Sequence, residues 1–216
     1  MIRAVFFDLD GTLFDRASAH HRYCADLIGR RPDAFDAGPS AALDALLDGC
    51  DDPGWDRSAF ARRAAAAFPR LGTVVEIRRD HERRFAAFIR PEPGLAGLID
   101  GLHGRDLAIV TNGPGRGQRA KLAGLGLGPR TPRAFVSGEL GVGKPDPTPF
   151  LAALAWAGRR PEETLFVGDD PARDVAGAAG VGMTTCWVAR GRGYPPGFPA
   201  PDLTIDRVAD LLGVLS

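Results

Sequence analysis

Short runs of apolar residues, rich in Val, Ile, Phe and Thr, recur along the chain. They occur at Ile2–Phe7, Leu107–Val110, Ala134–Val136, Leu165–Val167 and Thr184–Val188, and each predicts a buried strand. Between the later runs, apolar residues follow helical spacing at Leu95–Leu102, Gln118–Leu125, Phe150–Trp156 and Ala172–Ala179. Alternating strands and helices predict an α/β fold whose core is a Rossmann-like, doubly wound parallel sheet.

The segment 16–90 breaks this alternation. It follows the first predicted strand and shows helical periodicity in Ala, Leu and Arg, interrupted near Pro32, Pro39, Pro53 and Pro69. We interpret it as an inserted bundle of about four helices, with Pro and Gly marking the joints. The predicted domains are therefore a Rossmann-like core, 1–15 and 91–216, and an inserted α-helical cap, 16–90.

Composition restricts the ligands and partners to be expected. Lys plus Arg and Asp plus Glu number 27 each, so no net field would attract a nucleic acid polymer or an anionic membrane. Three widely spaced cysteines, Cys24, Cys50 and Cys186, suit reduced thiols. The N-terminus does not read as a signal peptide and no apolar run would span a bilayer. We therefore expect a cytoplasmic protein that binds a small molecule. A monomer or a homodimer is expected, although composition does not distinguish between them.

Polar residues follow the predicted strands where ligands bind in open α/β sheets, outside the carboxyl ends of the strands. These positions are Asp8, Asp10, Gly11 and Thr12; Thr111, Asn112 and Gly113; Lys144 in a later loop; and Asp169 and Asp170. Carboxylates, a hydroxyl and a lysine are thus predicted to gather at one edge of the sheet.

The carboxylates of Asp8 and Asp10 can take two different roles in one reaction. One carboxylate can attack phosphorus, while the other protonates the leaving oxygen and later takes a proton from water. An ordinary turn or helix cap is the alternative for an isolated Asp-x-Asp-Gly. A calcium-binding loop of the EF-hand type needs further oxygen ligands and a closing Glu. Leu13 and Phe14, which follow Thr12, have no side-chain oxygen, so this alternative is rejected.

Lysine is rare in this arginine-rich chain. Lys121 and Lys144 are its two lysines. Where arginine serves as the usual surface cation, a retained lysine suggests a requirement for a compact point charge.

Four segments, in order, resemble the motifs of the haloacid dehalogenase superfamily. They are Phe7-Asp8-Leu-Asp10-Gly11-Thr12-Leu13, then Thr111-Asn112-Gly113, then Gly141-Val-Gly-Lys144-Pro145-Asp146-Pro147, and finally Val167-Gly168-Asp169-Asp170-Pro-Ala-Arg-Asp174. Gln118-Arg-Ala-Lys121-Leu and the glycines after it resemble the subclass whose helical cap, of the C1 type, follows the first motif. The segment 16–90 matches the place of such a cap.

This resemblance implies a magnesium-dependent phosphatase of small phosphorylated metabolites such as nucleotide or sugar-type phosphates. It makes Asp8 the nucleophile and Asp10 the general acid and base, with Thr111 and Lys144 as further catalytic residues. The Asp8 carboxylate, the Asp10 carbonyl and Asp169 would hold Mg²⁺, a cation that prefers hard oxygen ligands. The substrate-binding residues expected are Thr12, Asn112, Gly113 and, from the cap, His20 and Arg84.

Two positions need separate comment, because one departs from the family pattern and the other has two possible roles. Asp170 stands where the family usually has a small hydroxyl residue, and it would either change metal affinity or turn outward. Asp174 would either support the metal site indirectly or cap the following helix. The competing functions are a phosphomutase of the same cap subclass, a 2-haloacid dehalogenase and a non-catalytic binding protein. Asp10 argues against the dehalogenase, since that branch normally lacks this carboxylate.

Overall fold

A computed structural model describes residues 1–36, 38–48 and 56–215. The chain divides into two compact units: Met1–Asp15 with Pro91–Ser216, and Arg16–Arg90. Cys50 and Pro53, two residues singled out in the sequence, lie outside the described part. Cys24 and Cys186 are buried and neither forms a disulfide within that part. In the same residues, none of the helices is both long enough and apolar enough to cross a membrane.

The first unit is built on a parallel sheet of six strands in the order β3-β2-β1-β4-β5-β6. The strands are β1 (Ala4–Phe7), β2 (Asp106–Thr111), β3 (Arg133–Val136), β4 (Thr164–Gly168), β5 (Thr184–Val188) and β6 (Leu203–Ile205). This order is that of a doubly wound sheet, so the predicted α/β fold is confirmed. The short edge strand β6 was missed because three residues carry too little periodicity to detect.

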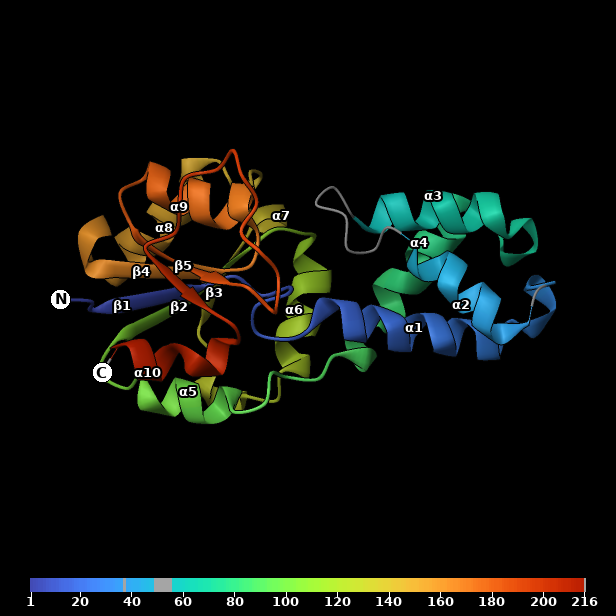
Figure 1. The fold of residues 1–216 in the computed structure, drawn as a ribbon, viewed down its shortest axis with the longest axis horizontal. Coiled ribbons are helices and arrows are strands. Elements are labelled where there is room, and N and C mark those ends of the chain that lie inside the picture. Colours follow the sequence, from blue (N-terminus) through green and yellow to red (C-terminus); the bar gives the residue numbers. More distant parts are fainter. Residues whose placement is uncertain (37, 49–55, 216) are drawn as a thin grey trace. The chain divides into compact units, whose positions relative to one another are not determined.

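Helices cover both faces of this sheet, with α8 and α9 on one face and α5 and α10 on the other (Figure 1). The α-helices of the unit are α5 (Leu95–Gly101), α6 (Gly115–Gly124), α7 (Ser137–Leu140), α8 (Pro147–Ala157), α9 (Gly177–Gly180) and α10 (Leu211–Leu215). On the α8 face, Phe6, Phe150 and Phe166 form the centre of a buried core. Phe150 and Phe166 meet edge to face with ring centroids 5.0 Å apart, a favoured arrangement for aromatic pairs.

Local sequence explains where the helices begin. The Asp146 carboxylate accepts a hydrogen bond from the Thr148 amide at 2.8 Å, and Pro147 occupies the first turn of α8. The expected continuous helix 172–179 is instead a π-helical turn, Pro171–Ala176, followed by α9. Asp170 accepts hydrogen bonds from two amides at the start of this turn, and Pro171 comes next, so these two residues determine where the turn begins.

The second unit consists of helices joined at proline-containing turns. The described α-helices are α1 (Arg16–Arg30), α2 (Pro39–Leu47), α3 (Arg57–Ala67) and α4 (Val74–Arg84), with 3₁₀ turns at Pro32–Ala34, Pro69–Leu71 and Phe85–Phe88. Thr73 and Glu76 form a reciprocal capping box at the start of α4. Tyr23, Phe60 and Phe85 pack in the interior of this unit.

Candidate active site

The chain places its polar motifs at one edge of the sheet. β1 lies between β2 and β4, and all three strands run parallel. Asp8 follows β1, Thr111 ends β2, and Asp169 follows β4. Carboxyl ends of parallel strands meet at the same edge, and the strand order reverses beside β1, which is where such folds bind ligands.

Asp8 is a buried carboxylate with a cation beside it. Its Oδ1 accepts a hydrogen bond from Lys144 Nζ at 2.7 Å, and its Oδ2 lies 3.5 Å from the Thr12 hydroxyl. Asp8 is 6% exposed and Thr12 is fully buried. The Asp8 amide donates to the Val167 carbonyl at 2.8 Å, which fixes the carboxylate beside β4.

Burial controls the protonation of Asp8. Loss of water around the carboxylate raises the pKa of Asp8 to about 7, Lys144 opposes this rise, and Asp174 and Asp10 add to it. The site therefore holds more negative charge than its buried lysine balances. A divalent cation would favour the ionised, nucleophilic form of Asp8.

Lys144 joins two buried carboxylates. Its Nζ lies 2.7 Å from Asp8 Oδ1 and 2.6 Å from Asp174 Oδ1, and it sits 5.2 Å from the centre of the Phe166 ring. Although burial opposes the charged ammonium, Asp174 and Asp8 raise the pKa of Lys144 above its usual value. Lys144 is therefore a fixed positive charge next to the predicted nucleophile.

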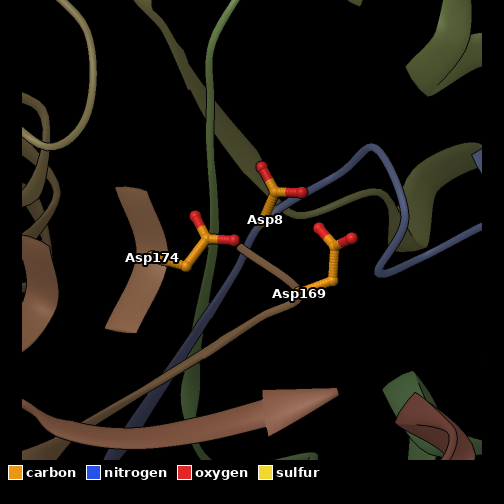
Figure 2. A group of neighbouring side chains, drawn as sticks. All are labelled: Asp8, Asp169 and Asp174. Atoms are coloured by element: carbon orange, nitrogen blue, oxygen red, sulfur yellow. The ribbon is translucent and has the colours of Figure 1, made fainter. Parts of the chain in front are cut away.

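Three carboxylates come together at this point. Asp8, Asp169 and Asp174 each offer an oxygen atom, and these oxygens lie within 4.8 Å of one another. Figure 2 shows the three side chains gathered beside the ends of the strands. Hard, negatively charged oxygen ligands fit Mg²⁺. The sequence predicts that Asp10 contributes its main-chain carbonyl, and this contribution stays a prediction.

The main-chain carbonyl and the side chain of Asp169 each have a partner. Its carbonyl accepts a hydrogen bond from Trp187 Nε1 at 3.0 Å, and Arg192 Nη2 lies 3.4 Å from its carboxylate. Gly11 adopts φ +89°, and a Cβ at this position would overlap the Asp169 carboxylate. Glycine at position 11 therefore permits both the turn after β1 and the approach of Asp169 to Asp8.

The two departures from the family pattern have different structural roles. Asp170 accepts hydrogen bonds from the Ala172 and Arg173 amides, both at 2.9 Å, so it caps the turn that follows. Asp174 is 1% exposed; its Oδ1 binds Lys144, and its Oδ2 accepts from the Asp170 amide at 3.0 Å. Asp174 thus orients Lys144 directly.

The Asp10 carboxylate accepts hydrogen bonds from two side chains of α6. Gln118 Nε2 donates to Asp10 Oδ2 at 2.8 Å, and Lys121 Nζ lies 2.5 Å from Oδ1. Gln118 Nε2 also donates to the Thr111 hydroxyl at 2.6 Å. The sequence pattern includes Gln118 and Lys121 but assigns them no role.

Asn112 and Gly113 are involved in contacts between loops. The Asn112 side chain accepts from the Lys144 amide and donates to the Lys144 carbonyl, both at 2.8 Å. The Gly113 amide donates to the Ser137 hydroxyl at 2.9 Å. In this structure Asn112 positions Lys144, and binding of substrate by Asn112 or Gly113 stays a prediction.

Arg190 anchors the loop after β1 through hydrogen bonds to its main chain. It donates to the Gly11 carbonyl at 2.6 Å, to the Thr12 carbonyl at 3.2 Å and to the Glu92 carboxylate at 2.9 Å. Glu92 is 5% exposed. Sequence reasoning did not identify this pair, because one arginine among many gives no signal in this composition.

His20 lies in the interior of the Arg16–Arg90 unit. It is 1% exposed, its ring meets Phe60 edge to face at 4.7 Å, and its Nε2 lies 3.6 Å from Cys24 Sγ. This burial argues against the expected contact of His20 with substrate. Burial, reinforced by Arg16 and Arg63, lowers the pKa of His20 to about 4.

Acid should destabilise the protein through His20. Between pH 6.5 and about 4 the unfolded chain protonates this histidine while the folded chain does not, so the free energy of unfolding falls as pH falls. We expect His20 to account for a loss of about 2 kcal/mol between pH 7 and pH 5. Urea unfolding of the wild type and of His20→Leu at both pH values measures this. His21→Leu, an exposed neighbour, is the control and should retain the wild-type pH dependence. Equal pH dependence in all three would contradict the expectation.

Arg84 belongs to an ion-pair network on the same unit. Its Nε lies 3.2 Å from Asp80, which also pairs with Arg30 and accepts from the Tyr23 hydroxyl at 3.0 Å. The Arg84 side chain is half-exposed. A role for Arg84 in binding substrate stays a prediction.

Comparisons with known proteins agree with the family that the motifs resemble and with the fold. Residues 2–182 match the haloacid dehalogenase-like hydrolase family. Phosphoserine phosphatase of Thermus thermophilus is 45% identical over 148 residues, which is 68% of this chain and 57% of that protein. Glyceraldehyde 3-phosphate phosphatase of Methanopyrus kandleri is 30% identical over 230 residues, covering 100% of this chain and 97% of that one.

The fold also matches a solved structure. The HAD-hydrolase YfnB from Bacillus subtilis, bound to magnesium, superimposes with a TM-score of 0.80 at 23% identity, over 100% of this chain and 99% of that one. The family match covers most of the chain and includes the segments that carry Asp8, Thr111, Lys144 and Asp169. The chain belongs to the haloacid dehalogenase-like hydrolases.

Proposed function

We propose that this enzyme is a magnesium-dependent phosphatase that cleaves small phosphate monoesters through an aspartyl-phosphate on Asp8. The observation that carries the proposal is the buried Asp8 carboxylate, hydrogen-bonded to Lys144 within a cluster that includes Asp169 and Asp174. Such a carboxylate has a fixed position, a neighbouring cation and little competing water. These are the conditions for attack on a phosphoryl group.

In the first proposed step, an Asp8 carboxylate oxygen forms a bond to phosphorus while the bond from phosphorus to the ester oxygen breaks. Asp10 donates its proton to that leaving oxygen, which departs as an alcohol. Lys144 stabilises charge on Asp8 and on the phosphoryl oxygens. The Thr111 hydroxyl, buried at the end of β2, donates to a phosphoryl oxygen.

In the second proposed step, water attacks the phosphorus of the aspartyl-phosphate. Asp10, now a carboxylate, accepts a proton from this water as the new bond from oxygen to phosphorus forms. The bond between Asp8 and phosphorus breaks, which releases inorganic phosphate and restores the Asp8 carboxylate. Asp10 recovers its proton in the same step, so the cycle is balanced.

Asp8 and Asp169, together with the Asp10 carbonyl, are the residues proposed to hold Mg²⁺. When bound, the cation supplies charge stabilisation at the phosphoryl oxygens. The carboxylates of Asp8 and Asp169 support this assignment, since each offers an oxygen and these two oxygens lie within 4.8 Å of each other. Asp174 binds Lys144 and the Asp170 amide, so we assign it to orienting the lysine.

The proposed substrates are small phosphate monoesters. Relatives act on phosphoserine and glyceraldehyde 3-phosphate, which are both small alkyl esters. Nucleotide and sugar-type phosphates belong to the same chemical class and are also proposed. A cytoplasmic location and a monomeric or homodimeric state stay predictions from the sequence.

Phosphate release in magnesium and in a chelator tests this function. The panel should include O-phosphoserine, glyceraldehyde 3-phosphate, a nucleoside monophosphate and a sugar phosphate. We expect release in magnesium, loss in the chelator and recovery when magnesium is restored. Asp169→Asn should require at least about 10-fold more magnesium, an effect that even outer-shell changes can produce. Asp170→Asn, which keeps an oxygen for the helix cap, is the matched control.

Other outcomes would favour the competing functions. Phosphoryl transfer back to a product, without net phosphate release, would favour a phosphomutase. Halide release from a 2-haloacid with no phosphatase activity would favour a dehalogenase. Magnesium binding without turnover of any substrate would favour a binding protein.

A further inference from the structure

Two side chains from one turn of α6 contact the two oxygens of Asp10 separately. Gln118 Nε2 lies 2.8 Å from Oδ2, and Lys121 Nζ lies 2.5 Å from Oδ1. Residues three apart on a helix share a face, so both donors approach the carboxylate from the same element. We call Gln118 and Lys121 the α6 pair. With a donor on each oxygen, rotation of the Asp10 carboxylate would break at least one contact.

Gln118 also fixes the direction of a second polar group. Its Nε2 donates to the Thr111 hydroxyl oxygen at 2.6 Å in addition to Asp10. An amide nitrogen has two hydrogens, so both are used. A hydroxyl oxygen that accepts here must direct its own hydrogen elsewhere. The Thr111 proton is therefore available to another acceptor, such as a phosphoryl oxygen.

The surroundings determine the orientation of the Gln118 amide. The residue is fully buried, and its Oε1 has no hydrogen-bond partner among the described residues. The amide oxygen cannot donate a hydrogen bond, so the amide nitrogen is the end that faces Asp10 Oδ2 and the Thr111 hydroxyl. The side-chain hydrogen bonds of Gln118 within the described part thus lie on the side of the site.

Gln118 and Lys121 are rare residue types in this chain. Gln118 is the only glutamine in the chain, and Lys121 is one of two lysines among 27 Lys and Arg residues. The other lysine, Lys144, binds Asp8. A compact ammonium suits a confined carboxylate better than the broad guanidinium used elsewhere. Each of the two paired aspartates of the first motif therefore has its own lysine.

We propose that the α6 pair are positioning residues for the reaction of the proposed function, on which this inference rests. They hold Asp10 where its proton passes to the leaving oxygen as the ester bond breaks, and where it later accepts a proton from the attacking water. Gln118 in addition directs the Thr111 hydroxyl toward the phosphoryl group. Neither residue contacts the substrate in this account.

Leaving-group dependence separates positioning from a merely structural role. Gln118→Met and Lys121→Met keep side-chain length and remove the donors. Arg119→Met is the matched control, because it removes an exposed ion pair with Glu139 from the same helix. The substrates are 4-nitrophenyl phosphate, whose leaving group needs no proton, and the alkyl monoester that the wild type hydrolyses best.

We expect both α6 variants to lose about 10- to 100-fold in kcat/KM for the alkyl ester, since misplaced proton donors cost this much. For 4-nitrophenyl phosphate, kcat/KM of Lys121→Met should change by less than about 3-fold, because proton transfer contributes little to that step. Gln118→Met should lose more than Lys121→Met on this ester, because it also releases the Thr111 hydroxyl, but less than it loses on the alkyl ester. Arg119→Met should match the wild type on both esters. Equal losses on the two esters would overturn the proposal.

Crystal structures of the wild type and the two variants test the positioning without turnover. Asp10 should occupy one orientation in the wild type and a different or multiple orientation in each variant. An unchanged Asp10 in both variants would overturn the proposal. If the wild type released phosphate from neither ester, the proposed function would fail, while this structural comparison would still decide whether the α6 pair positions Asp10.

Discussion

Replacement of Asp8 by asparagine is expected to abolish phosphatase turnover, with kcat reduced by about 10⁴-fold or more, because the nucleophile is lost. Asparagine keeps the shape of the side chain, and Lys144 keeps its contact with Asp174 at 2.6 Å. The fold should therefore survive. Initial rates with a saturating alkyl monoester in magnesium measure the effect.

A neighbouring aspartate provides the control for this change. Asp170→Asn lies at the same edge of the sheet, but its carboxylate faces the amides of the following turn. We expect its rate to stay within about 3-fold of the wild type, since a surface cap that keeps an oxygen acceptor costs little. Circular dichroism and thermal unfolding of both variants should show folded protein. Substantial activity in Asp8→Asn would refute the assignment of the nucleophile.

Lys144→Met is expected to lower both activity and stability. Loss of one preorganised charge at a reacting phosphoryl group should reduce kcat by about 10²- to 10³-fold. The variant also leaves Asp8 and Asp174 buried without their shared cation, which should cost about 3–5 kcal/mol where both are ionised. Steady-state kinetics and urea unfolding measure the two effects.

The loss of stability in Lys144→Met should depend on pH. Lys144 lowers the pKa of both Asp8 and Asp174, so its removal raises both further above the unfolded value of 3.8. The folded state then binds more protons than the unfolded state near neutrality, and the free energy of unfolding falls as pH rises. Destabilisation should be larger at pH 8 than at pH 6. A constant loss across this interval would contradict the electrostatic explanation.

A double variant separates the two roles of Lys144. Lys144→Met with Asp174→Asn removes one buried positive and one buried negative charge together. We expect it to recover most of the stability lost in the single variant, because one uncompensated carboxylate is gone. Activity should not recover, since the charge beside Asp8 is still missing. Recovery of activity would show that Lys144 only maintains the fold.

The sequence predicts the main features of this site because its motifs follow strands. The parallel order of β1 and β4 brings Asp8 and Asp169 to one edge, and the loop before α8 carries Lys144 to Asp8 there. Apolar runs predict five of the strands to within a few residues of their ends. These features depend on local patterns and on the general geometry of parallel sheets.

Other features depend on tertiary contacts that no local pattern encodes. Arg190 reaches the carbonyls of Gly11 and Thr12 from a distant part of the chain. The polar ring of His20 suggests a residue that faces a ligand, yet His20 is buried in its unit on the same helical face as Tyr23 and Cys24. Tertiary packing decides whether a polar side chain faces the site or caps a neighbouring turn: Asp174 binds Lys144, whereas Asp170 accepts from the amide of Ala172.

Detection of the phosphoryl group on Asp8 tests the central claim most directly. The wild type, mixed with an alkyl phosphate monoester and magnesium and quenched in acid during turnover, is digested and examined by mass spectrometry. We predict a phosphoryl group on the peptide that contains Asp8, and none on that peptide from Asp8→Asn. Phosphate release from wild-type protein whose only phosphorylated residue lies elsewhere would contradict the account.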